Sequence, residues 1–254
     1  MGASWTVIGA GSILPREGYG SSGHALRADF GAPVTLFDCG PGTIRSLAAA
    51  GIGLEEVERV VLTHFHADHM LDLFALAFAR RNPAFVAPPL ELIGPVGLGK
   101  RLSGVADVLG GSTRFEGTEL IEVEPGEEPQ SMEKDGITLS WVRTQHTDSS
   151  LAWRADVGPT SVTYTGDTCE VPEVVELAQG SHLFVCECSF ADEHAIPTHL
   201  TPSSAARMAR DAHVHCLLLT HFYPGLDPLE ARAVAARTFE GSIEIAHDGS
   251  VHAF

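Results

Sequence analysis

The stretch THFHADHM (residues 63–70) packs three histidines and one aspartate into six consecutive positions, directly after the apolar run at 60–62. The β-branched run predicts a buried strand that ends near His64. His64 and His66 are then expected on one side of the extended segment that leaves the strand, while the aspartate and the third histidine open the next helix. Imidazoles and carboxylates grouped in this way are typical of metal ligands, and four of them suit two neighbouring ions better than one.

Outward from this stretch, apolar periodicity and Gly/Pro punctuation predict an α/β fold. Strands are expected at 5–9, 26–30, 34–38, 60–62, 90–93, 119–123, 137–146, 151–157, 161–164, 182–188, 217–220 and 243–246. Helices are expected at 43–50, 68–79, 96–109, 174–178, 202–212 and 228–239. The segments at 26–30 and 34–38 are predicted to pair as a hairpin, and Arg80 and Arg81 to end a helix, where their charge offsets the helix dipole.

A short internal echo links two distant parts of the chain. Residues 61–65 read VLTHF and residues 218–222 read LLTHF, so two predicted strands both end in Thr-His-Phe. The echo indicates two similar βα halves that face each other.

Length and charge limit the possible functions. The 254 residues are expected to form one domain, 1–254, and 33 acidic against 16 basic residues give a formal charge of −17. Long nucleic acids bind chiefly through Lys and Arg, so this balance argues against them and favours a small anionic substrate. No apolar run is long enough for a membrane helix, the start has no secretory signal, and five cysteines without zinc-finger spacing suit a reducing compartment. A cytoplasmic protein is expected.

The HxHxDH pattern resembles the signature of the metallo-β-lactamase fold superfamily. The resemblance implies a four-layer αβ/βα sandwich with a dinuclear metal site along one edge. It also implies further ligands at later strand ends, and each has a matching position here: His146 after ITLSWVRTQ, Asp167 in VTYTGDT, and His221 in LLLTHF.

On this resemblance the ligands divide into two sets that share one aspartate. The first ion, zinc or manganese, is assigned to His64, His66, His146 and Asp167. The second is assigned to Asp68, His69, Asp167 and His221. The charges of two divalent ions exceed those of two carboxylates and a bridging hydroxide, so the site is expected to attract an anion and to use that hydroxide as nucleophile.

His199, in the segment PTHLTP, resembles the HxT histidine of the ribonuclease Z and phosphodiesterase branch of that superfamily. The resemblance implies a proton donor or charge stabiliser near the scissile phosphate, and we count Asp68 and His199 as the candidate catalytic residues. Thr201 is the predicted N-cap of the helix that follows, with proline at its first position.

Members of that branch that process transfer RNA carry a long arm between the third histidine and the bridging aspartate. Only 20 residues separate His146 from Asp167, and they are predicted to form two strands and a turn. The chain is therefore more similar to the armless bacterial relatives, which include cyclic-nucleotide phosphodiesterases.

Several alternatives stay open on the sequence. The same site chemistry suits a lactone, a β-lactam or an aryl sulfate, and a ribonuclease Z-like nuclease or a metal-binding scaffold without activity are further possibilities. Dimers are usual among similar proteins, so a homodimer is also among the expectations.

Overall fold

The computed structural model describes residues 2–86 and 88–254, and its strands fall into two sheets. The first sheet contains β1 (Ser4–Gly9), β2 (Gly23–Arg27), β3 (Val34–Phe37), β4 (Val57–Val61), β5 (Leu90–Pro95), β6 (Thr118–Val123) and β14 (Val251–Ala253). The second contains β7 (Gln130–Lys134), β8 (Ile137–Arg143), β9 (Leu151–Val157), β10 (Thr160–Tyr164), β11 (Leu183–Glu187), β12 (Cys216–Thr220) and β13 (Ser242–Ile245). Helices are α1 (Thr43–Ala49), α2 (Ala67–Met70), α3 (Asp72–Arg80), α4 (Leu98–Leu109), α5 (Pro172–Leu177), α6 (Pro202–Asp211) and α7 (Pro228–Ala235), with short 3-10 turns η1 (Leu54–Glu56), η2 (Gly111–Thr113) and η3 (Asp192–His194).

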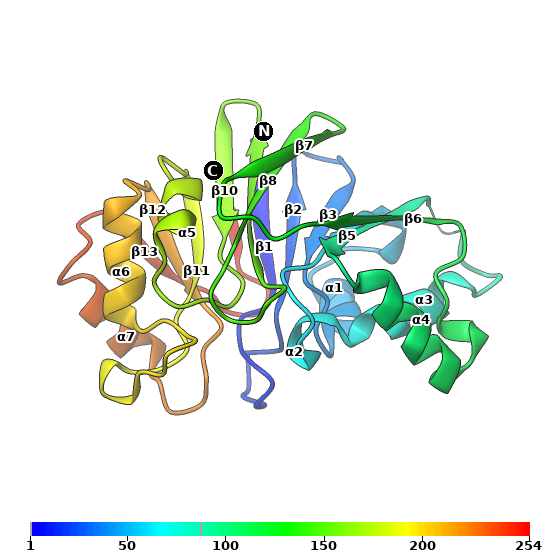
Figure 1. Cartoon of the computed structure of the whole chain (residues 1–254), viewed down its shortest axis with the longest axis horizontal. Helices are drawn as coiled ribbons and strands as arrows, with labels where there is room; N and C mark the ends of the chain where they lie inside the picture. The colour runs from blue at the N-terminus through cyan, green and yellow to red at the C-terminus, as the bar shows by residue number, and fades with distance from the viewer. Residues whose placement is uncertain (1, 87) are drawn as a thin grey trace.

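The two sheets form the inner layers of a sandwich, and helices cover both outer faces (Figure 1). Strand order is β14-β1-β2-β3-β4-β5-β6 in the first sheet and β13-β12-β11-β10-β9-β8-β7 in the second. Helices α1, α3 and α4 lie beside the first sheet, and α5, α6 and α7 beside the second (Figure 1). The expected four-layer αβ/βα arrangement is confirmed, as is the hairpin pairing of β2 with β3.

Three apolar cores hold these layers together. The central core lies between the sheets, where Trp5 and Phe37 of the first pack in one cluster with Trp153 and Val185 of the second. Each outer core joins one sheet to its helices. Burial of apolar surface on both faces of both sheets explains why several strands read as continuous apolar runs rather than as alternating ones.

The predicted helix at 68–79 is divided into α2 and α3. The backbone N–H of Asp72 donates to the carbonyl of Cys39 at 3.0 Å instead of continuing the helix, and the Asp72 carboxylate accepts from the backbone N–H of Ile44 at 2.9 Å. Tertiary hydrogen bonds to a neighbouring loop therefore override local helix propensity, and they fix the short turn that carries the histidine motif.

Two strands were not predicted, the one predicted at 26–30 lies earlier, at Gly23–Arg27, and the one predicted at 137–146 is too long. β7 and β14 are largely exposed and lie at or near the sheet edges, so they lack the apolar alternation that marks a buried strand. β8 ends at Arg143, which leaves His146 in the following loop and not within the strand.

The two Thr-His-Phe segments follow corresponding strands of the two sheets. β4 pairs in parallel with both of its neighbours, and so does β12. This arrangement agrees with the two facing halves that the echo predicted. Across the described residues, no helix has both the length and the apolar character that a bilayer crossing requires.

Candidate metal centre

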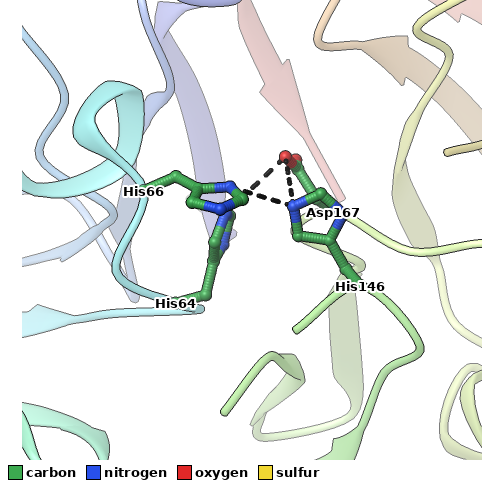
Figure 2. Close-up of side chains that lie close together, drawn as sticks. All are labelled: His64, His66, His146 and Asp167. Atoms are coloured by element: carbon green, nitrogen blue, oxygen red, sulfur yellow. Dashed lines mark hydrogen bonds and ion pairs between the residues drawn. The ribbon is translucent and has the colours of Figure 1, made fainter. Parts of the chain in front are cut away.

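The candidate ligands all follow strand ends, and they come from both sheets. His64 and His66 lie between β4 and α2, and His146 lies beyond the end of β8. Asp167 follows β10, and His221 follows β12 directly. Since the sheets face each other, these loops meet at one edge of the sandwich, which places residues far apart in the sequence side by side (Figure 2).

The side chains converge into groups whose size and chemistry suit metal ions. Ligand atoms within 4.8 Å of one another come from His64, His66, His146 and Asp167 in one group, from Asp68, His69 and His221 in a second, and from Asp167, His199 and His221 in a third. The first group coincides with the first predicted set. The second contains three members of the second predicted set, and the fourth member, Asp167, lies against it.

Asp167 stands between the two groups with one oxygen toward each. Its Oδ2 lies 3.7 Å from His64 Nε2 and 3.6 Å from His146 Nε2. Its Oδ1 lies 3.4 Å from His69 Nε2 and 3.5 Å from His221 Nε2. A carboxylate with this orientation can contribute one oxygen to each of two neighbouring ions.

Unpartnered polar atoms test whether ions fit here. His64 Nε2, His69 Nε2, His221 Nε2 and Asp167 Oδ1 are buried and have no hydrogen-bond partner among the described residues. Buried polar atoms are almost always paired, because burial without a partner costs about 1–3 kcal/mol each. Four such atoms facing one another are explained if their lone pairs are directed at cations, so the residues fit a metal pair.

Electrostatics favour the protonation states that metal ligands need at His64, Asp167 and Asp68. At His69, burial would lower the pKa, but Asp167 raises it well above its usual value. Burial, followed by the nearby His69, holds the pKa of His64 well below its usual value, so the imidazole is neutral with a free lone pair. Burial alone would raise the pKa of Asp167, but His221 and His69 hold it well below its usual value. Burial likewise opposes ionisation of Asp68, and His221, whose Nε2 lies 3.5 Å from the Asp68 carboxylate, lowers its pKa to about 2.

Asp38, which the sequence did not mark, organises the residues behind His69. The carboxylate is fully buried and lies 2.8 Å from His69 Nδ1. It also accepts from Tyr164 Oη at 3.0 Å and from the backbone N–H of Thr63 at 2.8 Å. An imidazole held at Nδ1 presents Nε2 to the site. Histidines that bind metal ions usually form such a supporting hydrogen bond through their other ring nitrogen. Its only sequence signal was an aspartate at the end of an apolar strand, in LFDCGPG.

Gly40, two residues later, lets the motif backbone approach this loop. A Cβ on Gly40 would lie 1.9 Å from the carbonyl oxygen of Asp68, which no side chain tolerates. The glycine thus permits the contact between the two loops that places Asp68 and His69 at the edge.

We expect Asp38→Asn to lower the free energy of unfolding of chelator-treated protein by about 3 kcal/mol, because buried donors would lose an anionic acceptor. Asparagine tolerates the left-handed backbone of this position, where φ is 58°. Tyr164→Phe removes one of the same hydrogen bonds and should cost only about 1 kcal/mol. Urea denaturation measures both values, and equal costs for the two variants would contradict the central role of Asp38.

His199 lies beside the ligands and is held by a second buried acid that the sequence did not mark. His199 Nδ1 is 3.0 Å and 3.1 Å from the two carboxylate oxygens of Glu187. Glu187 is fully buried and also accepts from the backbone N–H groups of Thr168 and Leu200 and from the hydroxyl of Ser189. Burial would lower the pKa of His199, but Glu187 raises it above its usual value. The only sequence signal for Glu187 was an acid inside the apolar run LFVCECSF.

The ring of His199 lies close to those of two candidate ligands. Its ring centroid lies 4.7 Å from that of His146 and 5.8 Å from that of His221. Thr201 caps α6 as predicted and accepts from the backbone N–H of Ser204, so His199 stands two residues before the N-cap of this helix. Elsewhere, Cys186 and Cys188 are free thiols buried in the core between the second sheet and its helices, which agrees with a packing role.

Comparisons with known proteins agree with this geometry. A sequence profile described as "Beta-lactamase superfamily domain" matches residues 35–222. The chain is 28% identical over 268 aligned residues to "Ribonuclease Z" of Mycobacterium avium (strain 104), covering 96% of this chain and 95% of the relative. The metallo-beta-lactamase fold protein YhfI from Bacillus subtilis superposes with a TM-score of 0.85 at 24% identity, covering 98% of each chain. Human short-form tRNase Z superposes with a TM-score of 0.79 at 22% identity, covering 98% of each chain.

Proposed function

The chain belongs to the beta-lactamase superfamily, in its ribonuclease Z and phosphodiesterase branch, and on this premise we propose that it hydrolyses small phosphodiesters such as cyclic nucleotides, with two bound metal ions. The observation that carries the proposal is the set of four buried, unpartnered ligand atoms at the sandwich edge. Because the candidate ligands come from both sheets, we further propose that residues 1–254 act as one hydrolase domain.

We assign one ion to His64, His66, His146 and Asp167, and the other to Asp68, His69, Asp167 and His221. Imidazole and carboxylate ligands favour zinc, and manganese is the alternative. When bound, two such ions would supply an activated water nucleophile and offset the negative charge of the phosphoryl group.

The chain's own residues would supply the proton for the leaving group. Glu187 engages His199 at Nδ1, which leaves Nε2 as the nitrogen that can face a substrate. The raised pKa of His199 keeps this nitrogen protonated over a wider pH range. His199 would therefore donate a proton to the departing alkoxide. Asp68 and Asp167 would hold the metal ions on the opposite side of the site.

Two features favour a small substrate over transfer RNA. The segment between His146 and Asp167 contains β9 and β10, which pair with each other inside the second sheet and build no separate arm. The formal charge of −17 opposes a long polyanion. Transfer-RNA 3′ processing stays the second candidate, because the relatives named Ribonuclease Z match over nearly their full length.

The test is a substrate panel with purified, metal-supplemented protein. We expect turnover of bis-p-nitrophenyl phosphate and of 3′,5′-cyclic AMP that disappears after chelation and returns with zinc or manganese. A precursor transfer RNA with a 3′ trailer forms the second arm. Metal-dependent cleavage of the RNA without turnover of the cyclic nucleotide would establish the second candidate instead, and no metal-dependent turnover of any substrate would refute both.

A further inference from the structure

A cavity away from the metal centre collects positive charge in this acidic protein. It has a volume of about 540 Å³ and lies where α3 ends and β6 begins. Three arginines line it, namely Arg80, Arg81 and Arg114. Helices α3 and α4 stand at one end of the molecule in Figure 1, and none of the metal-centre residues lines the cavity.

Arg80 carries the uncompensated charge of the cavity. Arg81 pairs with Glu116 at 2.9 Å, and Arg114 pairs with Asp107 at 2.9 Å. Within residues 2–86 and 88–254, Arg80 forms no ion pair: its Nη2 donates to the carbonyl of Pro88, and its Nη1 is buried without a hydrogen-bond partner. Burial lowers the pKa of Arg80, but a guanidinium stays protonated, so a partly buried cation is left without an anion among the described residues.

A hydroxyl beside Arg80 is in the same condition. Thr118 lines the cavity, and its Oγ1 is also buried without a partner among the described residues. Both residues line the cavity, and these two atoms lie beneath its wall. A guanidinium and a hydroxyl-bearing side chain at one cavity wall match the oxygens of a phosphate or carboxylate group, which accept several hydrogen bonds.

A second, smaller cavity of about 210 Å³ lies next to the first and has a more apolar wall. The two share three lining residues, Arg114, Phe115 and Thr118. The rest of its wall consists of Leu92, Gly99, Leu102, Ser103 and Leu120. The pair of cavities therefore offers a cationic end and an apolar end on either side of Phe115.

We infer that the two cavities form one binding site for an amphipathic organic anion, separate from the metal centre. The phosphate or carboxylate head lies against Arg80 and Thr118, and the apolar body lies between Phe115 and Leu102. Both parts of the ligand contribute, because the head offsets the positive charge of the arginines and the body removes apolar wall from water.

Isothermal titration of the metal-loaded protein with octyl phosphate, octanoate, inorganic phosphate and 1-octanol tests the inference. We expect octyl phosphate or octanoate to bind, and the ligands that lack either the head or the chain to bind at least about tenfold more weakly. Comparison of the first two ligands distinguishes a phosphate site from a carboxylate site. Binding of 1-octanol as tight as that of both anions would overturn the inference, and so would binding of none of the four.

Three variants locate the site. Arg80→Gln should weaken binding by at least about tenfold, and Leu120→Gln should also weaken it. Arg114→Gln removes a second positive charge, from an exposed ion pair at the cavity wall, and should weaken binding as well. Arg210→Gln, which removes one positive charge from an exposed pair on α6, should leave binding unchanged. A ligand held at the metal centre instead would inhibit bis-p-nitrophenyl phosphate turnover competitively and would bind Arg80→Gln as tightly as wild type, and that result would refute the site.

Discussion

Replacing Asp167 with asparagine should abolish metal pairing and lower the phosphodiesterase kcat by at least about 1,000-fold, since metal assistance supplies several kcal/mol of transition-state stabilisation. Asparagine keeps the shape of the side chain but removes the negative charge that lies 3.4–3.7 Å from four imidazole nitrogens. Those nitrogens belong to both proposed ligand sets, so this one substitution weakens both. Elemental analysis of the purified variant should find fewer than two ions per chain.

Asp211→Asn is the matched control, because that carboxylate is exposed on α6 and contacts only Arg210 among the ion pairs of the described residues. It should retain the wild-type metal content and rate. Circular dichroism and thermal melting of both variants separate misfolding from ligand loss. An Asp167→Asn protein that still held two ions and turned over normally would mean that this carboxylate does not join the two halves of the site.

His199→Ala should lower kcat for 3′,5′-cyclic AMP by about 100- to 10,000-fold and leave the metal content unchanged. The substrate must release a ribose alkoxide, a poor leaving group that needs a proton as the bond breaks. The p-nitrophenolate released from bis-p-nitrophenyl phosphate is stable without one. If His199 is the proton donor, its loss should therefore slow the aryl substrate much less than the cyclic nucleotide.

Equal losses on the two substrates would instead assign His199 to charge stabilisation alone. Glu187→Gln should show the same substrate pattern with a smaller loss, because the glutamine still contacts Nδ1 but removes the charge that raises the pKa of His199. We expect the alkaline limb of the cyclic AMP pH–rate profile to move to lower pH in this variant. A variant that lost rate without any movement of that limb would indicate that Glu187 acts only through packing.

The histidine motif made much of the fold and of the site predictable. His64, His66, Asp68 and His69 lie within one short segment, so a strand end and a helix start suffice to place them together. The echo of Thr-His-Phe located His221 at the end of a second buried strand. By contrast, α2 and α3 were predicted as one helix. The backbone hydrogen bond from Asp72 to Cys39 that divides them joins residues 33 positions apart, so no local pattern reveals it.

The residues that sequence reasoning missed act through partners distant in the chain. Asp38 contacts Tyr164, and the two are 126 positions apart. Glu187 and His199 come from different elements, a buried strand and the loop before α6. Each acid by itself resembles an ordinary polar residue near a strand end, and only the folded arrangement shows that it is buried and fully hydrogen-bonded.

By itself, the sequence determined the layered α/β class through local periodicity, and the short motifs at its strand ends carried the family resemblance that implied the seven candidate ligands. The tertiary structure alone decided how Asp167 faces both groups of imidazoles, which acids hold His69 and His199, and that Arg80 has no ion pair within the described part of the chain. The physical reason is that burial and hydrogen-bond pairing depend on which distant segments meet, and a linear pattern does not encode those distances.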